Sequence, residues 1–130
     1  DLCFIRPEAT FGESRLDFYV EDINKNKGFV EVKGVTLEED GIVSFPDAPT
    51  LRGVRHLNEL INLKEQGYNT YVIFVVQMEK AKYFTPNYKC HQEFGETLKQ
   101  AKECGVNIVA ISCNVTEDSL TLKETIPIKI

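Results

Sequence analysis

Three polar residues in the first third of the chain have the types and spacing that phosphodiester hydrolysis would need. Asp17, Glu31 and Lys33 follow the pattern D-(x13)-E-x-K. Carboxylates on adjacent strands are hard oxygen ligands of the kind that Mg²⁺ prefers, and a bound ion polarises a phosphate and lowers the pKa of a bound water. The lysine ammonium would orient that water or stabilise the developing charge. E-x-K alone is a short pattern, and a surface ion pair is the simpler explanation of it.

Two predicted strands would bring these three residues together. Apolar and polar residues alternate over 14–22 and again over 29–37, and the turn-forming run INKNKG lies between them. This pattern predicts an antiparallel hairpin. Its apolar residues are expected to face the core helices: Leu16, Phe18, Val20, Val30 and Val32. The two acids and the lysine would then share the opposite face, with same-face neighbours about 7 Å apart along a strand.

The rest of the chain predicts two helices and two further strands. A helix should begin at Thr50, its N-cap, and stop at Gly67, and a second helix is expected over about 91–104. The runs 69–77 and 106–115 are almost continuously apolar and β-branched, which is typical of strands covered on both faces. This order predicts an α/β fold, a three-layer sandwich with a mixed central sheet.

Three segments have weaker patterns. Residues 38–49 are expected to form a turn-rich connection or a short edge strand, and residues 80–90 a loop. The segment 117–130 predicts a terminal hairpin arm, in which Pro127 indicates an edge position.

Composition limits the classes of protein that the chain can belong to. With 130 residues and 42% hydrophobic content, one domain is expected. No segment approaches the roughly 18 to 20 apolar residues of a membrane span, and no leader pattern is seen, so we expect a cytoplasmic protein or a piece of one. The net charge of -5 excludes a global basic field for nucleic acid, so phosphate contact must be local, metal-bridged or assisted by another region. The four cysteines form no C-x-x-C pair, which argues against a zinc site.

Five separated blocks of the sequence resemble the sugar fermentation stimulation protein family. They are ESRLDF, VEVKGVTL, FPDAPTLRGVRHLNEL, VIFVVQ, and FTPN followed by F...L..A...GV, and their order and spacing agree over essentially the whole chain. The C-terminal half of that family resembles the PD-(D/E)XK nucleases. The resemblance therefore implies a restriction-endonuclease-like core and a single nuclease-like C-terminal domain over residues 1–130. It also implies that the family's smaller N-terminal OB-like DNA-binding domain is absent from this chain.

The resemblance also assigns roles to individual residues. Asp17 takes the place of the aspartate of the nuclease motif, and Glu31 and Lys33 take the place of its E-x-K, with Mg²⁺ or Mn²⁺ as the cofactor of an active domain. Glu8 would be a further acidic metal ligand, or else an exposed loop acid. Gln77 would be a polar group near the site, or else a solvated amide at the end of a strand.

Basic residues close to the predicted site are candidates for contact with phosphate. Arg52 and His56 lie in the first two turns of the predicted first helix, whose N-terminus attracts phosphate through its free N–H groups and its dipole. Cations there oppose the dipole, and phosphate contact would explain them; pairing with Asp47, Glu59 or the acidic run EED is the alternative. Arg15, two residues before the aspartate, would either reach a phosphate or pair with an acid.

Three functions are consistent with the sequence. The first is a metal-dependent DNA or RNA nuclease, in which the two carboxylates hold Mg²⁺ and the lysine positions the attacking water. The second, which the family name implies, is a non-catalytic DNA-binding regulator of sugar (maltose) catabolism with a vestigial metal site. In both, DNA is the expected partner, bound mainly with the help of the N-terminal domain. The third is a structural domain with a surface ion-pair cluster.

Overall fold

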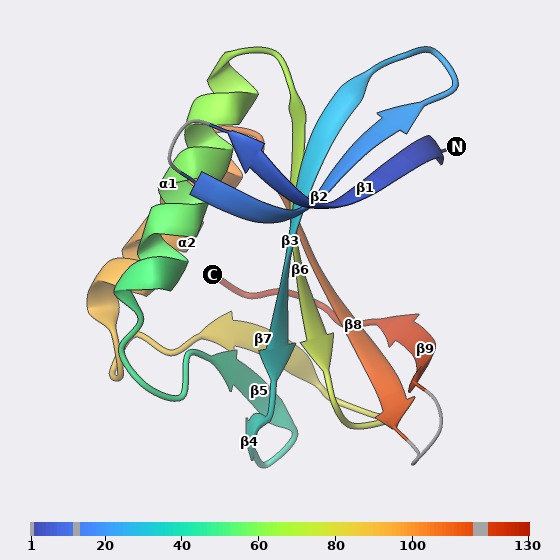
Figure 1. The fold of residues 1–130 in the computed structure, drawn as a ribbon. Helices are drawn as coiled ribbons and strands as arrows, with labels where there is room; N and C mark the ends of the chain where they lie inside the picture. The colour runs from blue at the N-terminus through green and yellow to red at the C-terminus, as the bar shows by residue number, and fades with distance from the viewer. Residues whose placement is uncertain (1, 12–13, 116–119) are drawn as a thin grey trace.

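The computed structural model describes residues 2–11, 14–115 and 120–130, which form a six-stranded sheet, a three-stranded sheet and two helices (Figure 1). The large sheet consists, in spatial order, of β1 (Leu2–Phe11), β2 (Ser14–Asp22), β3 (Lys27–Val35), β6 (Asn69–Val76), β8 (Asn107–Val115) and β9 (Leu120–Thr125). The small sheet consists of β4 (Leu37–Glu39), β5 (Ile42–Phe45) and β7 (Tyr83–Pro86). The helices are α1 (Leu51–Glu65) and α2 (Gln92–Glu103).

The large sheet is mixed, as predicted. Strands β1, β2 and β3 pair antiparallel, β3, β6 and β8 pair parallel, and β9 adds an antiparallel edge. Helix α1 lies between β3 and β6 in the chain, and α2 lies between β6 and β8. Parallel neighbours need such long crossover connections, because a tight turn can join only antiparallel strands. The predicted hairpin and the predicted mixed α/β sheet are both confirmed.

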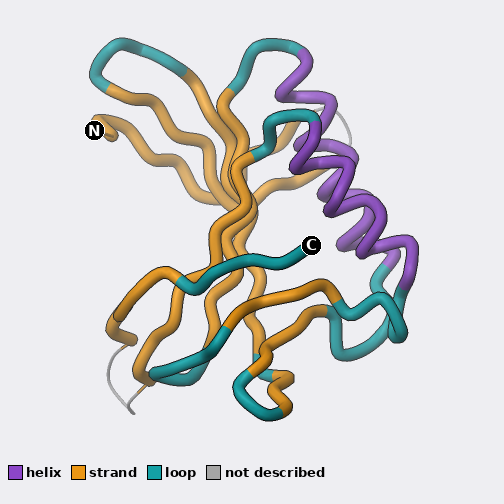
Figure 2. The backbone as a smooth tube through the Cα atoms, turned by 180° about the vertical axis from the view of Figure 1, so that it is seen from behind, coloured by secondary structure: helices purple, strands orange, loops and turns teal. Residues whose placement is uncertain are grey.

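Both helices and the small sheet lie on the same side of the large sheet (Figures 1 and 2). Alternate residues of β6 are fully buried, whereas the residues between them are only half-buried. The buried Phe74 of β6 stacks on Phe84 of β7 with ring centroids 4.3 Å apart, and Phe45 of β5 contacts both Phe74 and Phe94 of α2. These rings join the small sheet to the helices in one core.

Polar contacts fix where the two helices begin and end. The Thr50 side chain accepts a hydrogen bond from the Gly53 N–H at 2.9 Å and so caps α1. The Thr50 N–H donates to Nδ1 of His91, the residue that precedes α2, so the starts of the two helices are linked. After α1, Gly67 adopts a φ of 98°, a left-handed conformation that favours glycine. The predicted helix bounds are confirmed to within one or two residues.

Strands β1 and β7 were not predicted, and the segment 38–49, expected to be a connection or one short edge strand, contributes to two paired strands, β4 and β5. Strand β1 contains Pro7, which lacks an N–H for the ladder and weakens any strand signal, although β1 pairs along most of its length with β2. Strand β7 has four residues inside the predicted loop 80–90, and it is stabilised by parallel pairing with β5, which is distant in sequence. Strand β9 forms the expected edge, and residues 117–119 of the predicted arm lie outside the described residues. In the part of the chain that the structure describes, neither helix is long and apolar enough to cross a membrane.

The predicted orientation of the hairpin is wrong. Glu31 is buried on the helix-covered side together with Phe29 and Val35. Of the residues expected to face the helices, Leu16 does belong to the core, but the others line an open apolar hollow on the uncovered side: Phe18, Val20, Val30 and Val32. Alternation separates two faces of a strand but does not say which one the helices cover, because here both faces carry apolar residues.

Candidate active site

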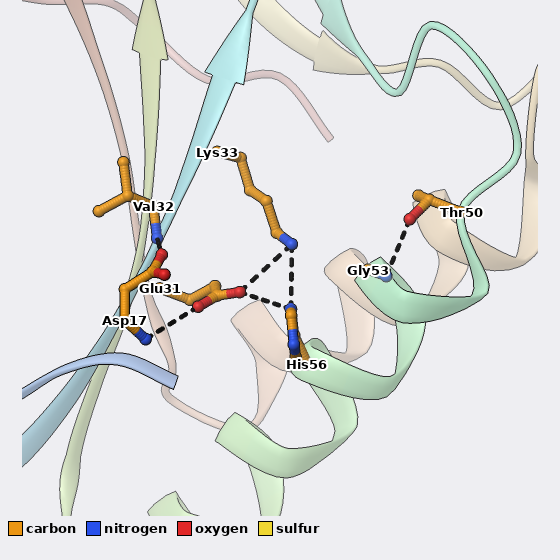
Figure 3. Close-up of polar contacts among 7 residues, drawn as sticks. All are labelled: Asp17, Glu31, Val32, Lys33, Thr50, Gly53 and His56. Atoms are coloured by element: carbon orange, nitrogen blue, oxygen red, sulfur yellow. Dashed lines mark hydrogen bonds and ion pairs between the residues drawn. The ribbon is translucent and has the colours of Figure 1, made fainter. Parts of the chain in front are cut away.

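The candidate site lies where β2 and β3 stop pairing through their backbones. The ladder ends at the pair Phe18 and Val30. Beyond this point the Asp17 N–H donates to Glu31 Oε1 at 3.1 Å, and the Val32 N–H donates to Asp17 Oδ2 at 2.7 Å (Figure 3). Each carboxylate therefore accepts a hydrogen bond from a backbone N–H of the neighbouring strand. This exchange holds the two predicted acids side by side.

Glu31 also belongs to a buried polar triangle with Lys33 and His56. The Lys33 Nζ lies 3.3 Å from Glu31 Oε2 and 3.1 Å from His56 Nδ1, and His56 Nδ1 lies 2.5 Å from the same Glu31 oxygen. Figure 3 shows the imidazole reaching from α1 toward the two side chains of β3. Glu31 is 3% exposed and His56 4% exposed. The E-x-K pair is therefore not a solvated surface ion pair.

Burial changes the acid–base properties of this triangle. It raises the pKa of Glu31 to about 7, with Lys33 opposing the rise and Asp17 adding to it. Burial also lowers the pKa of His56 to about 4, and the positive charges of Lys33, Arg52 and Arg55 lower it further. Near neutral pH the imidazole is uncharged. Two groups in contact whose pKa values are both strongly shifted are a physical marker of a functional site.

Glu8 and Gln77, the other two polar residues predicted near the site, lie at different places along the sheet: Glu8 is opposite Asp17, and Gln77 is beside Gly34. Glu8 is exposed on β1, and the pairs on either side of it place it opposite Asp17. Its φ of 54° is left-handed, at a break in the ladder between these strands. Gln77 is exposed at the end of β6, and its Nε2 lies 3.5 Å from where a Cβ of Gly34 would stand. A Cβ at Gly34 would stand on the face of β3 opposite the Lys33 side chain, because successive residues of a strand face opposite sides. The Gln77 amide therefore lies away from the buried triangle.

The three predicted phosphate contacts also differ in their surroundings. Arg15 on β2 and Arg52 on α1 are exposed, and Arg52 is close enough to His56 to influence its pKa. His56 is instead buried and contacts Glu31 and Lys33, and its contact with a phosphate stays a prediction. The contact of His56 with the E-x-K motif is the feature that the sequence reasoning missed.

A sequence signal for the buried histidine was available. His56 lies three residues after Gly53, four before Leu60 and seven before Leu63, which are other buried members of α1. A residue on the buried stripe of an amphipathic helix points toward the sheet. A polar residue there needs a polar partner, and the E-x-K acid is such a partner.

The donor set suits a hard divalent cation. Asp17 and Glu31 supply carboxylate oxygens from neighbouring strands, and Asp17 Oδ2 and Glu31 Oε1 each accept one backbone hydrogen bond. Mg²⁺ is usually held by one or two carboxylates with water completing its shell. No cluster of three or more histidine, cysteine or acidic side chains that could hold a metal occurs among the described residues, so they form no ready zinc-type cage.

Comparisons with known proteins agree over almost the whole chain. Residues 2–119 match the family described as "Sugar fermentation stimulation protein RE domain". A sugar fermentation stimulation protein homolog from Clostridium beijerinckii is 57% identical over 128 residues, which cover 98% of this chain and 56% of the relative. A homolog from Desulfitobacterium hafniense is 52% identical over 130 residues, covering 100% of this chain and 57% of the relative. The chain thus spans about half the length of the curated relatives it matches.

A solved structure agrees with the fold as well. "The structure of Pyrococcus Furiosus SfsA in complex with Ca2+" matches with a TM-score of 0.89 and 32% sequence identity, and it covers 96% of this chain and 54% of that chain. This match confirms the predicted α/β fold class with its mixed sheet and restriction-endonuclease-like core.

Proposed function

Since this chain belongs to the sugar fermentation stimulation protein family and matches its restriction-endonuclease-like domain, we propose that it is a Mg²⁺- or Mn²⁺-dependent nuclease domain. The observation that carries the proposal is the convergence of Asp17, Glu31 and Lys33 at the point where β2 and β3 separate. Two carboxylates and an ammonium around one point are the groups that metal-dependent phosphodiester hydrolysis requires. The proposed substrate is DNA.

Each residue of the site has a distinct task in this proposal. Asp17 and Glu31 would hold the ion, which when bound supplies the charge that polarises a phosphate and acidifies a water. The backbone N–H of Asp17 keeps the Glu31 carboxylate in place. The Lys33 ammonium is a pure donor whose side chain is 14% exposed, so it can point a water or a phosphate oxygen toward the acids.

Exposed cations and a relative support the proposal further. Arg15 and Arg52 lie near the site and are free to contact phosphates of a bound strand. The Pyrococcus furiosus relative was solved with Ca²⁺, a hard cation that takes the same class of oxygen ligands as Mg²⁺.

Cleavage of labelled single-stranded and duplex DNA, with Mg²⁺, Mn²⁺ or EDTA, tests the proposal. We expect cleavage with either metal, none in EDTA, and a loss of about 100-fold or more in a Lys33→Met variant, which keeps the apolar stem and removes the ammonium. Asn58→Ala, an exposed substitution on α1, is the matched control. Equal cleavage by wild type and Lys33→Met would contradict the proposal.

A non-catalytic DNA-binding regulator of sugar catabolism is the second candidate. One observation favours it: the Glu31 carboxylate already has partners in Asp17, Lys33 and His56, so the site is satisfied without an ion. In that case wild type and Lys33→Met would both bind DNA, and neither would cut it with any metal.

A further inference from the structure

The ring of His56 is fixed by the packing of its helix. It lies in the second turn of α1, and the neighbouring Val54 and Leu57 belong to the core. The Thr50 cap sets the start of this helix, less than two turns before the histidine. The imidazole therefore meets β3 from a rigid element, which gives better control of a site than a loop would.

The contacts of Nδ1 define what this ring can do. An ammonium can only donate a hydrogen bond, and an ionised carboxylate can only accept one. Nδ1 faces both, at 3.1 Å from Lys33 Nζ and 2.5 Å from Glu31 Oε2. The shorter contact is satisfied when Nδ1 carries the proton and donates a hydrogen bond to Glu31 Oε2. The Lys33 ammonium then donates a hydrogen bond to the same oxygen.

Both oxygens of Glu31 are then held from different elements. The Asp17 N–H of β2 holds Oε1, and the His56 N–H of α1 holds Oε2. Carboxylates that hold a metal are commonly oriented in this way by hydrogen bonds from residues that do not touch the ion.

We propose that His56 is a positioning residue: from α1 it holds the Glu31 carboxylate, and through it the Lys33 ammonium, in the arrangement that the proposed metal-dependent hydrolysis uses. This rests on the proposed function for its purpose, but the contact itself exists without metal. The histidine therefore acts on the E-x-K pair and not on a phosphate.

Amide hydrogen exchange of the metal-free protein in EDTA tests the positioning role directly. The Asp17 N–H donates to Glu31 Oε1, so its protection reports whether that carboxylate is held. We expect a His56→Leu variant to speed exchange at Asp17 by about tenfold or more. A His56→Asn variant, which offers an N–H near the place of Nδ1, should restore protection to within about threefold of wild type. Unchanged protection at Asp17 in His56→Leu would overturn the proposal.

Further readouts separate positioning from general stability. Exchange at the core amide of Val72 and the urea midpoint report the global fold, and Asn58→Leu on the exposed side of α1 is the control. If His56→Leu does not fold, ¹⁵N spectra of the wild-type imidazole at pH 8.5 decide: a proton on Nδ1 supports the proposal, and a bare Nδ1 overturns it. If positioning is found and wild type nevertheless cuts no DNA with Mg²⁺, the proposed function fails and the positioning role stands.

Discussion

Glu31 is the residue whose chemistry its surroundings change most. It is 3% exposed, and burial raises its pKa from 4.5 to about 7. Between these pH values the folded state holds a proton that the unfolded chain has lost. The resulting stabilisation is complete below pH 4.5 and is lost as the pH rises through about 7. In the metal-free protein this acid therefore weakens the fold under the conditions in which it would bind a cation.

Replacing Glu31 by glutamine should remove this pH dependence. We expect Glu31→Gln to be nearly neutral at pH 5 and to stabilise the metal-free chain by about 1 to 3 kcal/mol at pH 8, where wild type must bury a carboxylate. His56, with a pKa of about 4, does not titrate in the folded protein over this range. Urea unfolding of both proteins in EDTA at the two pH values measures the difference. A difference that does not change with pH would contradict this account of Glu31.

Asp17 should matter for metal binding much more than for folding. Asp17→Asn keeps an oxygen that can accept the Val32 N–H, but it removes the negative charge. We expect the Ca²⁺ affinity to fall by about tenfold or more, and the free energy of unfolding to change by less than about 1 kcal/mol. Calorimetric titration with Ca²⁺ and urea unfolding in EDTA give the two numbers. An undiminished Ca²⁺ affinity would show that the ion binds elsewhere.

At the scale of elements, the site depends on two features of the fold. The first is the separation of β2 and β3, beyond which each of the two carboxylates accepts a hydrogen bond from a backbone N–H of the other strand. The second is the docking of α1, which carries His56 to β3. Helix α1 begins at a capped position, and the same residue is tied to the start of α2. Loss of the cap should therefore loosen the helix that completes the site.

Thr50→Ala tests the cap. Because the Gly53 N–H loses its acceptor, we expect a loss of about 1 kcal/mol of stability. Thr50→Ser keeps the hydroxyl and should lose less than half of this. Thermal or urea unfolding measures both variants, and equal losses in alanine and serine would mean that the hydroxyl is not the stabilising group.

The sequence predicted the elements better than their orientation. The hairpin, the helix that starts at Thr50 and the buried strands follow from local periodicity and capping, which are written into neighbouring residues. Strand β7 exists through its pairing with β5, a contact that no local pattern encodes. The covered face of β3 depends on where α1 packs, so alternation alone placed Val30 and Val32 on the wrong side.

The same limit applies to the candidate site. That Asp17, Glu31 and Lys33 share a face followed from strand geometry, and the structure brings them together. The burial of Glu31 and its contact with His56 required the tertiary packing of α1 on β3. The predictions for Arg15, Arg52 and Glu8 stay predictions, because they concern ligands that bind at the surface.

On the scale of the whole molecule, net charge would decide how this chain binds the proposed substrate, DNA. The net charge of -5 repels phosphate at long range, and the basic residues near the site, Arg15, Arg52 and Lys33, act only locally. A divalent ion between the carboxylates would reduce the local repulsion and bridge to a phosphate. Binding of DNA should therefore depend on the metal.

DNA affinity with and without Ca²⁺ measures this dependence. In EDTA at physiological salt we expect only weak binding, with a dissociation constant in or above the range of about 10⁻⁶ to 10⁻⁴ M. Ca²⁺ should tighten it, and Asp17→Asn should remove the effect of the ion. Nanomolar affinity in EDTA, measured by fluorescence anisotropy with a labelled duplex, would contradict the electrostatic argument.

We propose that one divalent ion binds between Asp17 and Glu31, within reach of Lys33. Diffraction from crystals of this chain soaked in Mn²⁺, with data collected at the manganese absorption edge, tests it most directly. We expect an anomalous peak between the two carboxylates in wild type and none in Asp17→Asn. An empty site in wild type at millimolar Mn²⁺, or a peak that persists in Asp17→Asn, would contradict it.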